Sequence, residues 1–388
     1  MKKTLLASSA LVGAALIAAP AHAGTVGSKD AMSVKLSGVI WMSAAFPDED
    51  ISAGRGRGYR LALNESEVHV NASNTADNGI KYGVSIELNG GAGEGGSDEA
   101  WAFLSSDSWG RIELGDQDDV TNRMRLGAHN AHKGFGGPIG GLGAFLAMWG
   151  GFGADNRGAR VDYDNFSTSD ATKVSYFSPR MGGFQVGASL TPDSGSNSGT
   201  AGLTDTDNDG DREGIISLAA NYTGKFGDTG VGLSATMQNG TQEDANGSAE
   251  TENDVETYDL GLKLSNGGFV AGVNYINHGE TGTSVANSAL GADSGTTWAV
   301  SVGWQNGPMG ISAWYLDHDK DNTSTSDINA RSTEITRMGI GLGYTVAPGW
   351  LLRGDFEVMD HDNISTAEVG STTDNDGRGF MVTSMFMF

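Results

Sequence analysis

Residues 231–238 read VGLSATMQ, and an apolar side chain occupies every second position of this stretch. The same period of two returns in the stretches 80–88, 258–264, 298–304 and 338–344. A period of two places alternate side chains on opposite faces of a β-strand. The chain is therefore predicted to be all-β, with one apolar face and one small or polar face on each strand.

The alternating runs are about ten residues long, which is the length of a tilted strand that crosses a bilayer. Their connections alternate between short and long along the chain. The short connections are 75–79, 107–110, 180–183, 226–230, 265–268, 306–308 and 347–349. The long connections are 47–58, 89–97, 119–172, 192–213, 239–253, 279–295, 319–332 and 361–376. This order predicts a transmembrane antiparallel up-and-down β-barrel of about 16 strands, which leaves no unpaired edge in the membrane.

The first residues resemble an export signal. Lys2 and Lys3 precede the apolar run 5–19, and the segment ends in Ala21-His22-Ala23. A charged start, a short apolar stretch and a small-x-small ending predict a cleavable signal peptide over residues 1–23. A membrane anchor is the alternative, but the run is short and rich in small residues. Residues 24–388 are then expected to form a single barrel domain.

Composition limits the classes of function. The chain has no cysteine, so thiol catalysis and cysteine-ligated metal sites are excluded. Its formal charge of −24 disfavours nucleic acid as a partner and favours cations. No G-x-S-x-G, H-E-x-x-H or Walker A motif is present, and the seven histidines are scattered, so an enzyme is not expected.

Three short motifs resemble the general (diffusion) porins of Gram-negative outer membranes. They are GIKYG at 79–83 after a short connection, YFSP at 176–179 followed by Gly183-Phe184, and the last strand 380–387 ending in Phe388. The resemblance implies an outer-membrane barrel, a homotrimer, and a third long loop folded into the lumen. It also implies contact with outer-membrane lipid and lipopolysaccharide, and recognition of the Phe388 strand by the outer-membrane assembly machinery. The acidic-Phe-Gly loop tip of enterobacterial porins is missing here.

The third long connection, 119–172, is the longest, and its stretch 134–146 is apolar and rich in glycine. Such a stretch is unfavourable in water, so we expect it to pack against the inner wall. Charged side chains at a constriction set ion selectivity. The candidates for that role are Asp116, Asp118, Asp119, Asp155, Arg60, Lys81, Arg111, Arg123, Arg125 and Arg157. Opposed acidic and basic groups would produce a transverse field, although each residue can equally be a solvated lumen residue.

Residues 205–211 read DTDNDGD, which spaces the carboxylates of Asp205, Asp207, Asp209 and Asp211 at every second position. This spacing resembles calcium-binding loops, although Ile216 stands where an EF-hand needs glutamate. A Ca²⁺ ion is one interpretation, and an acidic surface loop is the other. No other cofactor is expected.

These observations predict a general diffusion porin for small hydrophilic solutes and ions, with a moderate cation preference from the net negative charge. A substrate-specific channel is an alternative, which would need a basic ladder or an aromatic slide along the lumen. Trp41, Phe177 and Trp314 are in the inward phase but are too few to make a slide. A non-conducting adhesin or structural barrel would show the same strands and is the other alternative.

Overall fold

The structure is a computed structural model, and it describes residues 25–26, 31–50, 58–91, 96–139, 168, 170–195, 210–243, 252–321, 332–362, 364–365, 372–374 and 376–388. The predicted signal peptide 1–23 lies outside these residues. Among the described residues, no helix is long and apolar enough to cross a membrane.

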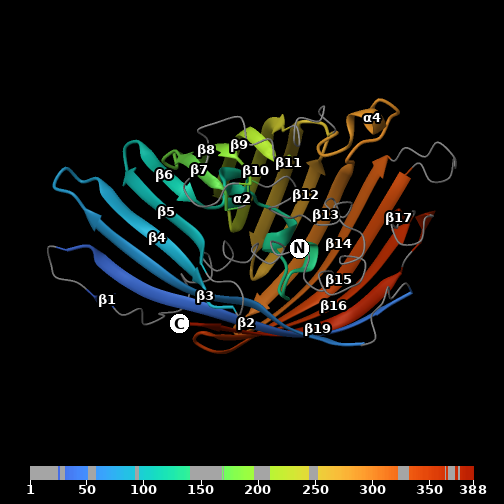
Figure 1. The fold of residues 1–388 in the computed structure, drawn as a ribbon. Helices are drawn as coiled ribbons and strands as arrows, with labels where there is room; N and C mark the ends of the chain where they lie inside the picture. The colour runs from blue at the N-terminus through green and yellow to red at the C-terminus, as the bar shows by residue number, and fades with distance from the viewer. Residues whose placement is uncertain are drawn as a thin grey trace.

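Sixteen antiparallel strands of the described chain close into a barrel, as predicted from the sequence (Figure 1). Each strand pairs with its neighbours in the chain, and the last pairs with the first. The strands are β2 (Ser33–Glu49), β3 (Arg60–Thr75), β4 (Lys81–Asn89), β5 (Ser97–Ser106), β6 (Gly110–Asp116), β7 (Thr172–Phe177), β8 (Phe184–Asp193), β9 (Arg212–Phe226), β10 (Thr229–Gln242), β11 (Val255–Asn266), β12 (Phe269–Asn277), β13 (Thr296–Asn306), β14 (Met309–Asp321), β15 (Ser332–Ala347), β16 (Trp350–Asp362) and β19 (Gly377–Met387). The short strand β1 (Thr25–Val26) adds to β2, and β17 (Ile364–Ser365) pairs with β18 (Thr372–Thr373).

The predicted short connections are the tight turns at one end of the barrel. In the first of them, the N–H of Gly79 donates to the carbonyl of Ala76 at 2.8 Å, and the N–H of Ala76 donates to that of Ile80 at 2.8 Å. Gly79 has φ +82°, a conformation that glycine adopts without steric cost. The long connections lie at the opposite end, so the two rims of the barrel differ as the spacing predicted.

The alternation of side chains separates an apolar outer face from a polar inner one. In β10, Ser234, Thr236 and Gln238 are buried inside the barrel, whereas Leu233 and Met237 remain exposed on the outside. Large aromatic side chains lie on the outer face close to the tight turns. Phe184, Phe226, Phe269 and Phe388 are each more than half exposed. This arrangement suits a lipid-facing band that ends in an aromatic girdle.

The two ends of the barrel sequence meet at Gly38 and Phe388. The N–H of Gly38 donates to the carbonyl of Phe388 at 2.9 Å, and the N–H of Phe388 donates to that of Gly38 at 3.0 Å. The Phe388 ring occupies the space beside Gly38, where an added Cβ would lie 2.5 Å from the ring. Phe388 therefore extends the pairing of β2 with β19, where the barrel closes, and its ring packs against β2.

The third long connection, which we call L3, folds into the barrel as predicted. Its described part contains α2 (Val120–Met124) and two short 3-10 turns, η2 (Ala128–Asn130) and η3 (Gly137–Ile139). Helix α2 lies against β8, β9 and β10; η2 lies against β11, β12 and β13; η3 lies against β14 and β15. The described part of L3 therefore runs along the inner wall. The connection after β12 contains a short helix, α4 (Val285–Ser288).

Candidate pore constriction

Asp119 anchors the start of L3. Its carboxylate caps α2 by accepting hydrogen bonds from the N–H of Thr121 at 2.8 Å and of Asn122 at 3.2 Å. It also accepts from the Ser217 hydroxyl at 2.6 Å and the Gln238 amide at 2.6 Å. Burial alone would raise the pKa of Asp119, but the hydrogen bonds from Ser217 and Thr121 outweigh it and lower the pKa. Asp119 therefore holds the loop to the wall and does not present a charge to the lumen.

Glycines on the inner wall let the backbone of L3 lie in direct contact with the strands. A Cβ added to Gly272 would lie 2.1 Å from the carbonyl oxygen of Gly127, and one added to Gly303 would lie 2.0 Å from that of Ala131. Gly261 makes the same kind of approach to Leu126 at 1.8 Å. Any larger residue at these positions would push the loop away from the wall.

Short polar side chains beside these glycines satisfy the backbone of L3. The N–H of Leu126 donates to the Ser234 hydroxyl at 2.9 Å, and that of Ala128 donates to the Asn274 side-chain carbonyl at 2.7 Å. Further along, the N–H of Lys133 donates to the Ser312 hydroxyl at 2.8 Å. These bonds replace the helix or sheet partners that an irregular segment lacks. The described part of L3 is thus fixed to the wall at several points.

Arg125 and His132, in the described part of L3, each contact an acidic side chain on the wall. Arg125 pairs with Asp259 at 3.3 Å, and His132 contacts Asp355 at 2.8 Å. Burial lowers the pKa of His129 to about 3, with the charge of Arg125 adding to the effect, so this ring is neutral at pH 7. Because Arg125 is buried and pairs with Asp259, it contributes little net charge to the lumen.

Arg111 and Arg123, two of the predicted candidates, meet at a shared carboxylate. The fully buried side chain of Glu113 accepts hydrogen bonds from both guanidinium groups, and Arg123 also donates to Gln117 at 3.1 Å. The Arg111 guanidinium lies 3.7 Å from the centre of the Phe103 ring. Stacking on an aromatic face fixes the plane of such a group.

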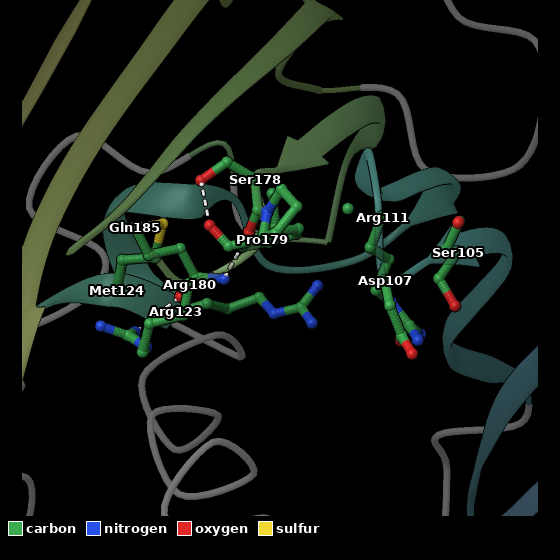
Figure 2. A pocket seen from close by; sticks show the side chains of 12 residues that line it. Ser105, Asp107, Arg111, Arg123, Met124, Ser178, Pro179, Arg180 and Gln185 are labelled. Carbon is green, nitrogen blue, oxygen red and sulfur yellow. Dashed lines mark hydrogen bonds between the residues drawn. The ribbon is translucent and has the colours of Figure 1, made fainter. Parts of the chain in front are cut away.

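A cavity of about 560 Å³ lies beside this cluster, at the turn end of β5 to β8. Figure 2 shows Arg123 and Arg180 to one side of it, and Arg111 and Asp107 to the other. Arg180, in the turn between β7 and β8, donates to the Gly183 carbonyl at 2.7 Å, to Gln185 at 2.7 Å and to Asn221 at 2.8 Å. These three acceptors are neutral, so the charge of Arg180 is not compensated by them.

An acidic wall lies on β3, β4 and β5, together with Asp118 and Asp170 next to the two ends of L3. His69 lies 2.7 Å from Glu67 and 3.7 Å from Glu87. Next to them, the carboxylate oxygens of Glu99, Asp118 and Asp170 lie within 4.8 Å of one another. The residues that form this acidic wall are Glu65, Glu67, Glu87, Asp98, Glu99, Asp118 and Asp170. Of these, only Asp118 was a predicted candidate.

The prediction for Asp116 is wrong. The strand register pairs Asp116 with Ala100 and Thr172, in the same phase as the exposed, outward Leu114. Its carboxylate accepts a hydrogen bond from the Thr172 hydroxyl. Because side chains alternate along a strand, one residue of offset moves this carboxylate from the lumen to the outer face.

Arg60 and Lys81 lie at opposite ends of the wall. Arg60 is the first residue of β3, at the loop end, in the inward phase opposite Ala45. Lys81 begins β4 at the turn end and pairs with Asp107 at 3.5 Å, both largely exposed. The structure therefore does not bring these two candidates together. Asp155 and Arg157 lie outside the described residues.

The sequence-based prediction does not contain Glu113 or most of the acidic wall, because its acidic candidates all lie in or near L3. The polar phase of each strand was the available signal, and it places Glu87 and Glu113 inside. The same signal places Glu65 inside, in phase with Glu67. It does not reveal Glu99, because Glu99 shares its inward phase with the aromatic residues Trp101 and Phe103.

The predicted calcium loop can be followed only at its end. Asp205, Asp207 and Asp209 lie outside the described residues. Asp211 is described, and its backbone carbonyl accepts a hydrogen bond from the Gln242 amide at 2.9 Å. Calcium binding by this loop therefore stays a prediction.

Comparison with known proteins agrees with the fold. A family model described as Gram-negative porin matches residues 7–364. No curated protein sequence matches the chain. OmpT, an outer membrane protein of Vibrio cholerae, has a similar structure, with TM-score 0.62 and 14% identity over 94% of this chain and 100% of that one. Its trimer form gives TM-score 0.61 and 13% identity over 92% and 100%.

A second similar structure is an anion-selective porin from Comamonas acidovorans, with TM-score 0.59 and 15% identity over 92% of this chain and 100% of that one. At such identities the solved structures show the fold alone. The family model carries more weight, because it covers most of the sequence, including the strands that hold L3 and the acidic wall. The chain belongs to the Gram-negative porin family.

Proposed function

We propose that this porin is a general diffusion channel for small hydrophilic solutes and ions, with a moderate preference for cations. The inward side chains are chiefly small, polar or charged, as a water-filled lumen requires. The described part of L3 lies flat along the wall, which supports a narrowed opening over a plugged one. Transport of this kind needs no catalytic group, and no enzymatic activity is expected.

One observation carries the cation preference. Carboxylates gather on the acidic wall, while the L3 cations Arg123 and Arg125 each have a carboxylate partner. Acidic groups within 4.8 Å of one another resist being ionised at the same time, and a passing cation stabilises their ionised form. The loop-side approach to L3 is therefore expected to concentrate cations.

Reversal potentials under a salt gradient test this proposal on purified protein in planar bilayers. A general porin should give large steps with a modest potential of the sign that cation flow produces. A reversal potential of the opposite sign would reject the cation preference while leaving the channel intact. Absence of conductance from folded protein would favour an adhesin or structural barrel. Small steps blocked by one solute would favour a specific channel.

Assembly is part of the proposal. The similarity to a trimeric form of OmpT supports a homotrimer, and the pairing of Phe388 with Gly38 supports recognition of the terminal strand by the assembly machinery. Outer-membrane lipid and lipopolysaccharide would surround the apolar outer face. Calcium bound by the 205–211 loop is a further proposal, which calorimetric titration of the purified protein with Ca²⁺ would test.

A further inference from the structure

We infer that the cavity between Arg111, Arg123 and Arg180 binds a small solute that carries a carboxylate or phosphate group. This inference deepens the proposed function, because it places a solute site inside the proposed channel. We call the site the turn-side pocket; it lies at the turn end of β5 to β8.

The charge around the turn-side pocket is unbalanced. Three guanidinium groups line it, and Glu113 is the carboxylate that two of them share. Asp107 also lines the pocket, but it is almost fully exposed and lies 3.5 Å from Lys81, which offsets its charge. Arg180 has no carboxylate partner among the described residues. An excess of positive charge therefore remains at the pocket.

Hydrogen-bond donors also remain unused. Arg111 uses its Nε for Glu113, and no hydrogen bond from its terminal nitrogens occurs within the described chain. The Arg111 guanidinium stacks on the Phe103 ring, which holds its plane in place. The neutral acceptors Gln185 and Asn221 hold the guanidinium plane of Arg180. A planar fork of N–H groups matches two oxygens of a carboxylate or phosphate. These features make a preformed receptor for an oxyanion.

The rest of the lining limits the ligand. Met124, Phe177 and Pro179 contribute apolar surface, and Ser105 and Gln185 add neutral polar groups. A cavity of about 560 Å³ has room for a small organic acid or phosphate ester. The pocket thus favours a small solute with one charged oxyanion end and a short organic remainder.

The position of the pocket separates it from the acidic wall. The wall lies on β3 to β5 toward the loop end, whereas the pocket opens beside the turns. An anion that enters from the turn end reaches the pocket before it reaches the clustered carboxylates. The two regions can therefore act on solutes of opposite charge in one lumen.

Calorimetric titration tests the site on detergent-solubilised, folded protein at low ionic strength. Succinate and inorganic phosphate are the two probes, and their comparison distinguishes a carboxylate from a phosphate ligand. We expect a dissociation constant on the order of 1 mM for at least one of them. Arg180→Gln should weaken binding about tenfold, because it removes a charge-assisted pair.

Lys225→Gln is the matched control, since it removes an exposed cation at the turn end of β9 that does not line the pocket. Arg111→Gln, on the other side of the pocket, should weaken binding as Arg180→Gln does and serves if that variant does not fold. Equal affinity in Lys225→Gln and Arg180→Gln, or no binding of either probe, would overturn the inference. Because calorimetry does not need conduction, such a result is distinct from failure of the channel proposal.

Discussion

Two parts of the inner wall serve opposite purposes. From β8 to β15 the wall carries glycines and short polar side chains, and the described part of L3 packs against them. On β3 to β5 the wall carries long acidic side chains instead. The first part is complementary to a segment of the protein itself, and the second has charge that the protein leaves only partly balanced. Residues that position the loop should therefore affect stability, and residues of the acidic wall should affect selectivity.

The largest effect is expected at Asp119. Asp119→Ala leaves buried donors on Ser217, Gln238 and α2 without an acceptor, which costs about 3 kcal/mol of unfolding free energy. Current noise should rise as the start of L3 loosens. Thermal unfolding in detergent and single-channel recording measure the two effects. A variant with the unfolding free energy and the current noise of the native channel would show that other residues hold L3.

The same anchor predicts a dependence on pH. The pKa of Asp119 is lowered in the folded protein, so its contribution to stability is complete above the ordinary aspartate pKa of about 3.9. It is lost as the pH falls through the lowered value. Added noise should thus appear only in strong acid, and Asp119→Asn should show it at every pH. Onset of noise near neutral pH in the native channel would contradict this assignment.

The close contact between L3 and the glycines of the wall is tested at Gly272. In Gly272→Ala, the new methyl group would lie 2.1 Å from the Gly127 carbonyl, so L3 must move toward the lumen axis. We expect a cost of about 1–3 kcal/mol and a lower conductance. Gly354→Ala is the control, because its Cβ would make only ordinary contacts, the nearest at 3.8 Å. Equal conductance in the two variants would mean that L3 does not depend on close contact with β12.

These tests separate what the sequence could predict from what it could not. Alternation and the spacing of turns predicted the sixteen strands, because both are local patterns. The inward loop was predicted from the resemblance to porins and from the apolar, glycine-rich stretch 134–146. The outward position of Asp116 and the anchoring role of Asp119 depend on register and on Ser217 and Gln238, which are distant in the sequence. The bulge near Glu65 is a property of the paired strands, and no single stretch of sequence contains it.

A smaller effect is expected on the acidic wall. Glu67→Gln removes one charge, and a charge about 8 Å from an ion in water contributes about 0.5 kcal/mol, so the cation preference should fall about twofold. Asp228→Asn removes an acidic residue in the tight turn between β9 and β10, at the turn end of the barrel, and should leave the preference nearly unchanged. The shift in reversal potential measures both. If the two variants shift it equally, total charge controls selectivity rather than the acidic wall.

The smallest effect is expected at Lys81. Its ion pair with Asp107 spans 3.5 Å, but the two side chains are 58% and 98% exposed, so water and salt screen the attraction. Lys81→Gln should change the unfolding free energy by less than about 0.5 kcal/mol. Thermal unfolding at low and high salt measures this. A loss comparable to that of Asp119→Ala would mean that the turn-end charges hold the barrel together. The division between a wall that positions L3 and an acidic wall that acts on passing ions would then have to be abandoned.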